Sequence, residues 1–364
     1  MMPALVRFTG SRRVAVVLML ATALLAGCGG GGVGRSASAQ EASPDASSSA
    51  FTPVTLTSCD GFTSTVASPL KRVLVSGPPE AELLDKLGAA DRLAGLAVPV
   101  QPGNVPQDLF DRIKDLPSLA PREDPFAQAS AEVLAVIDPD FVLGGYDLFT
   151  RDEAIPSQAE YEADGVVSFL MKSSSCDEKT IPTADDFYAD ILDLGRVFGA
   201  EEKAIALFNE LKAGHDALAK KLEGVTERPS VYLAAYYGDE SFTDPPYFQG
   251  ADSLTTALVA QAGGTSIFAN EGGIGGPTSW EVIAAKAPEY IGLYDFGKDP
   301  DGNKAYYDEG RSEFLAFAPA ASIPAVKNDR IFYVNADGLF GAYNLATLPA
   351  LEAMARGLHP ELFD

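Results

Sequence analysis

The stretch AAYYGDESFTDPPYFQG, at residues 234–250, concentrates side chains that could do two kinds of chemistry. Its five aromatic rings offer flat apolar faces on which a bulky ligand can pack. Its carboxylates, Asp239, Glu240 and Asp244, could pair for acid–base work on a sugar. Nothing in the sequence fixes their separation, and acids in exposed loops mostly serve solvation. We therefore interpret the stretch as a loop that presents aromatic walls to a ligand, with no catalytic residue.

Other residues that commonly carry catalysis or bind metals are scarce. The chain has two histidines: His215, which we expect to face solvent from a helix, and His359 beside Pro360. A zinc or manganese site needs several converging histidines and carboxylates, so we expect no metal site and no cofactor. Haem ligated by histidine is equally unsupported, although a tyrosinate could ligate iron. The Gly-rich NEGGIGGP (270–277) lacks the Lys-Ser/Thr ending of a phosphate loop, and we interpret it as mobile.

An enzyme is the second class to weigh. A serine hydrolase would need a Gly-x-Ser-x-Gly elbow and a histidine base, and the sequence has no such elbow. An extracytoplasmic hydrolase therefore remains only a distant alternative to a binding protein.

Two glutamates recur within an internal repeat. SAEVLAVIDPDFVLG (130–144) and SWEVIAAKAPEYIGL (279–293) align without a gap at an offset of 149 residues. Each copy predicts a short helix that ends near its proline and leads into a buried strand. Glu132 and Glu281 occupy equivalent positions in the first turns of these helices. The helix dipole alone would also favour an acid there, so a purely structural role stays open.

The elements around the repeat predict two α/β lobes with mainly parallel central sheets. In the first half, the strand Arg72–Ser76 is followed by a Gly-Pro-Pro turn and the helix Ala81–Leu87. In the second half, the strand Ser230–Ala235 is followed by the aromatic loop and the helix Asp252–Ala262. Ligands of such sheets bind at the carboxyl ends of the strands, where these loops lie.

One long helix joins the two lobes. Residues 201–225 have apolar side chains at helical spacing, acids in the first turn, lysines in the last turn and Gly224 as a stop signal. A single rigid connector implies a fixed spacing of the lobes with limited hinge motion. The expected organisation is a leader (1–27), a lipidated cysteine with a flexible linker (28–51), an N-terminal lobe (52–200), the interlobe helix (201–225) and a C-terminal lobe (226–364).

The N-terminus has the features of an export signal. Three arginines precede Val14–Leu25, a run of twelve residues that is apolar except for Thr22 and too short to span a bilayer. The run leads into Leu-Ala-Gly-Cys, which resembles the lipobox of bacterial lipoproteins and implies cleavage before Cys28 and lipid on its sulfur. Ordinary cleavage with Cys28 as a stray thiol is the alternative. The following Gly-, Ser- and Ala-rich segment would let the folded part roam on the order of 25 Å.

Charge and cysteine usage agree with a location outside the cytoplasm. Without the leader, the chain has 24 basic and 51 acidic residues, a formal net charge of −27, which argues against nucleic acid and anionic lipid headgroups as partners. With Cys28 assigned to lipid, Cys59 and Cys176 remain as an even pair in an oxidising compartment, and we expect a disulfide between them.

Taken together, these features resemble the substrate-binding lipoproteins of ABC importers that handle ferric siderophores, haem and cobalamin. The resemblance covers about residues 70–364 and rests on four segments in order: KRVLV…ELLDKLGAADRLAGL, EVLAVIDPDFVL, PPYFQGADSLTTALVAQAGGTSIF and SWEVIAAKAPEYIGL. It implies a ligand held in the cleft between the lobes, an ABC permease with its ATPase as partners, and a monomer anchored to the cell membrane only by its lipid.

The resemblance also implies site residues. The glutamates that meet permease arginines in relatives correspond to Glu132 and Glu281. Pro78-Pro79 and Phe340 are further cleft candidates, and core packing stays an alternative for Trp280. The predicted ligand-contacting residues are Tyr146, Phe149, Tyr237, Phe242, Tyr247, Trp280 and Tyr343.

The predicted ligand is a metal chelate. The cleft segments carry acids and aromatics, with Arg151 and Lys172 as the only basic residues nearby, which favours a neutral or cationic chelate such as a ferric hydroxamate over catecholate or citrate chelates. Cobalamin or another large organic ligand is the alternative cargo. A ligand sensor or scaffold without transport is the alternative role.

Overall fold

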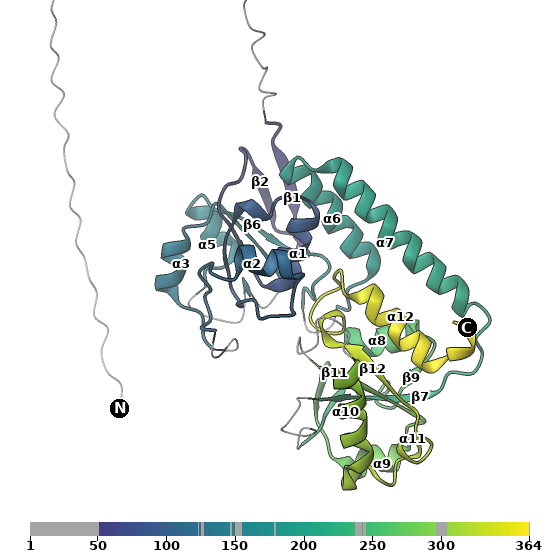
Figure 1. Cartoon of the computed structure of the whole chain (residues 1–364). Coiled ribbons are helices and arrows are strands. Elements are labelled where there is room, and N and C mark those ends of the chain that lie inside the picture. Colours follow the sequence, from purple (N-terminus) through teal and green to yellow (C-terminus); the bar gives the residue numbers. More distant parts are fainter. Residues whose placement is uncertain are drawn as a thin grey trace, which may run out of the picture. The chain divides into compact units, whose positions relative to one another are not determined.

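Each half of the folded chain is built on its own four-stranded sheet, as the computed structural model shows (Figure 1). The structure describes residues 51–364 except 123, 125–126, 146–147, 150–154, 178–179, 237–241, 243–244, 296–303 and 364. The leader, Cys28, the linker, Tyr146, Arg151, Tyr237 and the three carboxylates of the 234–250 stretch lie outside the described residues. In the described part, no helix is long and apolar enough to cross a membrane.

The sheet of the N-terminal lobe has the strand order β4-β3-β5-β6, with all neighbouring strands parallel. Every residue of β3 and β5 is buried, as in parallel sheets that are covered on both faces. An antiparallel hairpin, β1–β2, precedes this sheet. The elements of this half are β1 (Val54–Thr57), β2 (Thr63–Val66), β3 (Val73–Val75), α1 (Pro78–Lys86), η1 (Ala90–Arg92), β4 (Leu93–Leu96), α2 (Gln107–Ile113), α3 (Ala131–Ile137), β5 (Phe141–Gly144), α5 (Gln158–Ala163), β6 (Val167–Leu170) and α6 (Ala184–Phe198).

The sheet of the C-terminal lobe has the strand order β12-β11-β7-β9 and is also parallel throughout. A short antiparallel ribbon, β8–β10, lies in the same lobe. The elements are β7 (Ser230–Ala235), β8 (Tyr247–Gln249), α8 (Leu254–Gln261), β9 (Thr265–Ser266), β10 (Gly275–Pro277), α9 (Trp280–Lys286), β11 (Tyr290–Asp295), α10 (Lys304–Ala316), η2 (Ala318–Ala320), α11 (Pro324–Lys327), β12 (Ile331–Asn335), η3 (Ala336–Gly338), α12 (Thr347–Leu358) and η4 (Pro360–Leu362).

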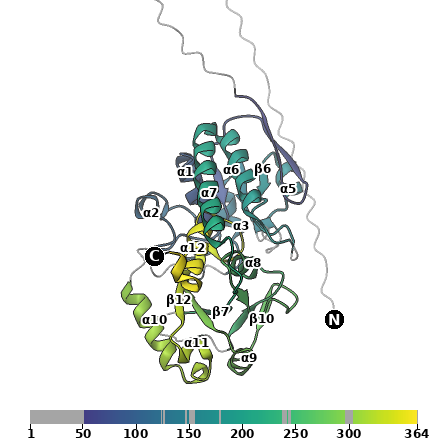
Figure 2. The ribbon, with the colours of Figure 1, turned by 90° about the vertical axis from the view of Figure 1, so that its right-hand side faces the viewer.

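The helix α7 (Glu201–Leu222) connects the lobes and packs along α6 (Figures 1 and 2). Its 22 residues correspond to a length of about 33 Å. The helix ends before the predicted residue 225 because Glu223 is extended and Gly224 has a positive φ of 91°. Leu211 and Leu218 of α7 belong to one hydrophobic cluster with buried residues of both lobes. The predicted fold class, two α/β lobes with parallel sheets joined by one long helix, is therefore confirmed.

The internal repeat produces the same local structure twice. The side chains of Ser130 and Ser279 each accept a hydrogen bond from a backbone N–H three residues ahead, at 3.3 Å, and so begin α3 and α9. Both helices end on a residue in the left-handed conformation, Asp138 with φ of 44° and Ala287 with φ of 50°, directly before the repeated proline. The strands β5 and β11 follow, as the sequence predicts.

Two local predictions need correction, the first in full and the second in its last three residues. The Gly-Pro-Pro segment is not a turn before the helix, because α1 begins at Pro78. Proline is favourable at the first helical position because the backbone N–H that it lacks would have no hydrogen-bond partner within the helix. The segment 270–277, predicted to be a mobile loop, ends in β10, which pairs with β8, and the N–H of Gly273 donates to the carboxylate of Asp252 at 2.8 Å.

Candidate functional site

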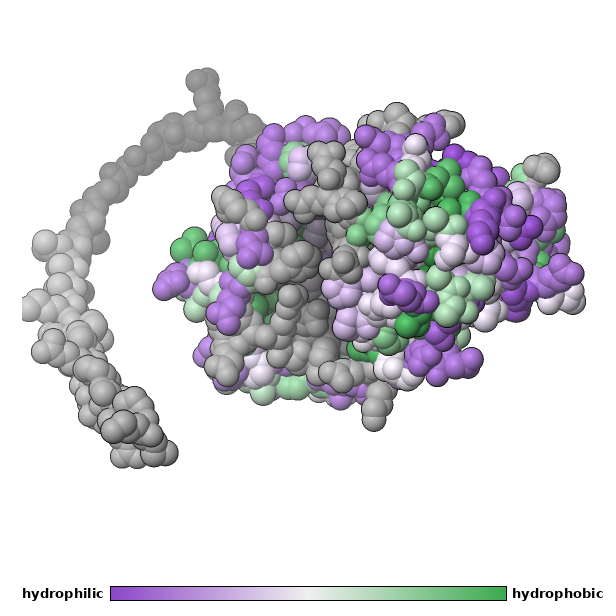
Figure 3. Space-filling model, turned by 90° about the horizontal axis from the view of Figure 1, so that it is seen from below, coloured by the Kyte–Doolittle hydropathy of each residue, from purple (hydrophilic) through white to green (hydrophobic). Residues whose placement is uncertain are grey.

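A cleft of about 720 Å³ opens between the two lobes. Segments that follow β3, β4, β5, β6 and β12 contribute to it, so it lies at the carboxyl ends of parallel strands, where α/β sheets bind ligands. On the surface that Figure 3 shows, hydrophilic residues surround smaller apolar areas. The described lining consists of Ser76, Gly77, Pro78, Pro79, Glu80, Ala97, Val98, Ala120, Ala127, Gln128, Ala129, Gly145, Leu148, Ile155, Ser174, Ser175, Asp177, Gln249, Asp252, Ser253, Leu254, Thr255, Ile274, Ala336, Asp337, Leu339, Phe340, Gly341, Ala342 and Asn344.

The charged side chains in the described lining are all acidic. Glu80, Asp177, Asp252 and Asp337 line the cleft, and no lysine, arginine or histidine is among the described lining residues. Such a surface attracts cations and opposes ligands that carry several negative charges. Among the described residues, no group of three or more histidines, cysteines and acids could hold a bare metal ion. The arrangement favours a neutral or positively charged molecule over a free metal or an anion.

Glu80 is the most deeply buried of these acids, with 8% of its surface exposed. It lies in the first turn of α1 and accepts a hydrogen bond from the N–H of Gly77 at 3.0 Å. Burial raises the pKa of its carboxyl group to about 7, although hydrogen bonds from its own N–H and from that of Gly77 act in the opposite direction. Near neutral pH, the carboxyl group of this lining residue is therefore partly protonated.

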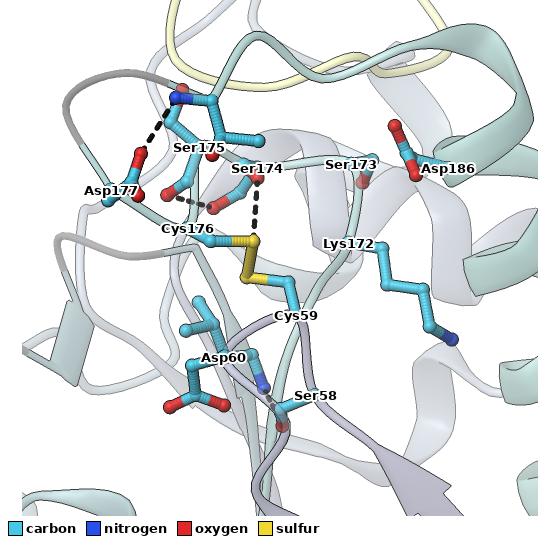
Figure 4. The surroundings of a disulfide bond; sticks show 12 residues. Ser58, Cys59, Asp60, Lys172, Ser173, Ser174, Ser175, Cys176, Asp177 and Asp186 are labelled. Atoms are coloured by element: carbon cyan, nitrogen blue, oxygen red, sulfur yellow. Dashed lines mark hydrogen bonds between the residues drawn. A yellow bond between two sulfur atoms is a disulfide. The ribbon is translucent and has the colours of Figure 1, made fainter.

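A disulfide fixes one wall of the cleft. Cys59 and Cys176 are bonded, as predicted, across 117 residues of sequence (Figure 4). The bond ties the β1–β2 hairpin region to the segment 173–177, of which Ser174, Ser175 and Asp177 line the cleft. A carboxylate of α6 accepts a backbone hydrogen bond from the same segment.

That carboxylate belongs to Asp190, which is fully buried. It accepts hydrogen bonds from the backbone N–H groups of Lys172 at 3.1 Å and Ser173 at 2.7 Å. Burial raises its pKa to about 6, against the lowering effect of these hydrogen bonds and of the lysine charge. The disulfide and Asp190 together hold the segment after β6.

The two lobes meet directly beside the cleft. Ser174 and Ala342 form an antiparallel bridge, and the N–H of Tyr343 donates to the carbonyl of Ser173 at 2.7 Å. The sequence predicted that His215 of α7 faces solvent. In the structure it is half-buried between Tyr188 and Tyr343. The prediction was wrong because the apolar spacing of α7 shows which face is buried but not that two tyrosines from other elements cover the position.

The predicted ligand-contacting aromatics that the structure describes do not line the cleft. Phe149 is buried edge-on against Tyr161, in one hydrophobic cluster with the lining residues Leu148 and Ile155. Tyr247 of β8 is 47% exposed and is two residues from the lining residue Gln249. Three others, Phe242, Trp280 and Tyr343, are buried in hydrophobic clusters with at most 6% of their surface exposed.

Core contacts explain where two of these rings lie. Phe242 meets Phe314 with 4.5 Å between ring centroids, and Trp280 meets Phe317 at 5.0 Å. The alternative of core packing for Trp280 is therefore the one that the structure shows. Of the aromatic residues considered from the sequence, Phe340 is in the described lining, and the cleft candidates Pro78 and Pro79 are in it too.

Sequence reasoning missed most of the lining because it is made of small and polar residues. Serines 174 and 175, Asp252, Asp337 and Asn344 carry no signal of their own. The only available signal was the position of these residues in the chain. Each residue comes soon after a strand of a parallel sheet or lies in a turn that leads into a helix.

The two repeat glutamates lie on exposed surface. Glu132 of α3 accepts a hydrogen bond from the side chain of Ser130 at 3.1 Å. The hydrogen bond from the Ser279 side chain and that from its own N–H lower the pKa of Glu281, which therefore stays ionised. Apolar side chains accompany both: Val136 is 70% exposed and Val282 is 43% exposed. The two helices thus present an acid and an apolar residue in each lobe.

Comparison with known proteins adds the family. The sequence model of the family described as periplasmic binding protein matches residues 74–337. Among curated proteins, none matches the chain.

Solved structures share the fold at low identity. A periplasmic binding protein from Veillonella parvula has a TM-score of 0.65 and 21% identity, over 85% of this chain and 98% of its own. An ABC-type Fe³⁺-hydroxamate transport system protein from Saccharomonospora viridis has a TM-score of 0.61 and 22% identity, over 85% and 98%. The periplasmic heme-binding protein RhuT from Roseiflexus sp. RS-1, in its apo form, has a TM-score of 0.58 and 20% identity, over 80% and 99%.

Proposed function

This chain belongs to the periplasmic binding protein family, a family of binding proteins rather than enzymes, and we propose that it captures a ferric siderophore for an ABC importer. In this proposal, lipid on Cys28 anchors the chain to the outer face of the cell membrane. The chain acts as a monomer and binds its ligand in the cleft between the lobes. The ligand then passes to a permease that an ATPase drives.

The observation that carries the proposal is the cleft itself. Its volume of about 720 Å³ is within the range of pockets for ligands of drug size and above, and is far larger than a site for a bare ion. Its acidic lining supports a neutral or cationic chelate, and a ferric hydroxamate fits this requirement better than a multiply anionic catecholate or citrate complex. The likeness to the Saccharomonospora viridis protein, whose description names Fe³⁺-hydroxamate transport, agrees with this choice.

Calorimetric titration of the purified full chain tests the ligand class. The probes are a ferric hydroxamate, a ferric catecholate, ferric citrate, cobalamin and haem. Calorimetry is preferable to tryptophan fluorescence because Trp280, the single tryptophan, is buried in the core of the C-terminal lobe. Submicromolar binding of the hydroxamate with no binding of the catecholate is the expected result.

Two variants locate the ligand. Asp252→Asn keeps an oxygen acceptor for the N–H of Gly273 but removes a cleft charge, and it is expected to weaken a cationic chelate about fivefold. Asp164→Asn, an exposed acid at the end of α5 outside the lining, is the matched control. Loss of binding in Tyr237→Ala would support the sequence-based assignment of that ring to the ligand.

The other outcomes point to the alternatives. Selective binding of cobalamin or haem would replace the siderophore by a large organic ligand in the same cleft. Binding without any permease-dependent uptake in cells would favour a sensor. Binding of none of the probes by a folded chain would refute the metal-chelate proposal.

Docking to the permease is the second part of the proposal. Glu132 and Glu281 lie at equivalent places in the two lobes, on exposed first turns, and are available to arginines of a membrane partner. The exposed Val136 and Val282 would add apolar contact at the same surfaces.

A further inference from the structure

We infer that His215 is a positioning residue for the cleft: it holds the wall segment Phe340–Asn344 against the N-terminal lobe. The inference rests on the proposed function in one respect only, namely that the cleft is the binding site. The wall segment belongs to the C-terminal lobe, and four of its five residues, Phe340, Gly341, Ala342 and Asn344, line the cleft. The fifth, Tyr343, points away from the cleft and is 1% exposed.

Both ring nitrogens of His215 are engaged. Its Nδ1 lies 2.9 Å from the carbonyl oxygen of Leu211 and 2.7 Å from the hydroxyl of Tyr188, and its Nε2 lies 2.9 Å from the hydroxyl of Tyr343. The carbonyl oxygen of Leu211 can only accept, so a neutral ring with its proton on Nδ1 satisfies this contact. In that tautomer Nε2 is an acceptor, and the Tyr343 hydroxyl donates to it.

The three residues come from three elements that must keep their places for the cleft to keep its shape. His215 lies on the interlobe helix α7, Tyr188 on α6 of the N-terminal lobe, and Tyr343 on the wall segment. Their rings also pack against each other, with centroids 5.9 Å apart for Tyr188 and His215 and 5.7 Å for His215 and Tyr343. The histidine therefore joins the connector to both lobes at one point.

A second observation marks the same turn of α7. Gly214 is a helix-interior glycine, which disfavours a helix unless packing requires it. A Cβ at this position would meet Cδ2 of Leu348, near the start of α12, and would require the end of that side chain to shift. The absent side chain lets the C-terminal lobe approach α7 closely beside His215.

The wall segment is tied to the opposite wall by backbone. The N–H of Tyr343 donates to Ser173 at 2.7 Å, and Ala342 is bridged to Ser174, which itself lines the cleft. Anchoring the Tyr343 side chain on α7 fixes the backbone that makes these bonds. Releasing it is expected to loosen both walls together.

The test uses four single variants and one double variant of the full chain. Tyr343→Phe removes one hydroxyl, His215→Leu removes the polar ring, and His215→Gln keeps an acceptor near the place of Nε2. His359→Leu is the matched control, because His359, the other histidine of the chain, is also buried and bonds the carbonyl of Gly263 at 3.1 Å. It lies outside the cleft lining.

The first measurement is amide hydrogen exchange without ligand. In Tyr343→Phe and His215→Leu, peptides that cover 173–177 and 340–344 are expected to exchange about fivefold faster, which corresponds to about 1 kcal/mol. His215→Gln is expected to stay within about twofold of the parent, and the His215→Leu/Tyr343→Phe double variant is expected to match the more affected single one.

The second measurement is the Kd for a ferric hydroxamate, which is expected to rise about fivefold in the same two variants and to recover in His215→Gln. Unchanged exchange in Tyr343→Phe, or the same acceleration in His359→Leu, would overturn the inference. A parent chain that binds no hydroxamate would refute the proposed ligand alone, since the exchange experiment needs none.

Discussion

Replacing Glu80 by glutamine is expected to change the pH dependence of folding stability. The hydrogen bond from the N–H of Gly77 to the Glu80 side chain caps the start of α1. Glutamine can accept the same bond, because glutamate and glutamine both serve at the third position of a helix. The substitution therefore removes the buried titratable group and keeps its local structural role.

The magnitude follows from the raised pKa. The carboxyl group of Glu80 titrates at about 7 in the folded chain and at 4.5 in its ordinary state. The folded state thus binds the proton more tightly, so the contribution of Glu80 to stability is fully present below the ordinary pKa and is lost as pH rises through the folded value. At 1.36 kcal/mol per pKa unit, the loss amounts to about 3 kcal/mol.

The assay is urea unfolding of the full chain, with its disulfide intact and without ligand, across this pH range. The free energy of unfolding of Glu80→Gln minus that of the parent is expected to increase by about 3 kcal/mol between about pH 4 and about pH 8. The matched control is Glu162→Gln, an exposed acid on α5. A difference that stays flat with pH, or that the control reproduces, would refute the assignment of a buried, proton-holding acid to the cleft lining.

Three further outcomes are expected. Replacing Cys59 and Cys176 by serine is expected to lower the free energy of unfolding by at most about 4–5 kcal/mol, since the bond spans 117 residues; urea unfolding with and without reductant checks this. The double variant Glu132→Ala/Glu281→Ala is expected to keep its ligand affinity but reduce permease-dependent uptake about tenfold, and equal uptake would contradict the docking proposal. Burial lowers the pKa of His215, so the stability of the parent relative to His215→Gln is expected to fall as pH decreases below the ordinary value of 6.5, as measured by thermal unfolding at several pH values.

Much of the fold could be predicted because local signals agree with one another. Ser130 and Ser279 cap equivalent helices, repeated prolines follow their ends, and buried strands come next. The strand Ser230–Ala235 has the bounds expected from the sequence. The disulfide could be predicted because only one pairing remained once Cys28 was assigned to lipid.

The site could be predicted less well, because the direction of a side chain depends on tertiary packing. Phe242 and Trp280 occur in segments that read as cleft loops, yet both rings complete the core of the C-terminal lobe. Tyr343 lies within a cleft-lining segment and points to the other side, toward His215. Residue type indicates that a ring will be buried but not whether a core or a ligand will bury it.

The Cys59–Cys176 bond also has a consequence for when the wall at 173–177 gains its covalent restraint. Protein disulfides form in oxidising compartments and are kept reduced in the cytoplasm. Before export, the serine-rich wall at 173–177 would be held only by hydrogen bonds such as those to Asp190. After export, the covalent bond closes the loop and secures the wall. On the proposed function, the wall would gain its covalent restraint only on the side of the membrane where the ligand is met.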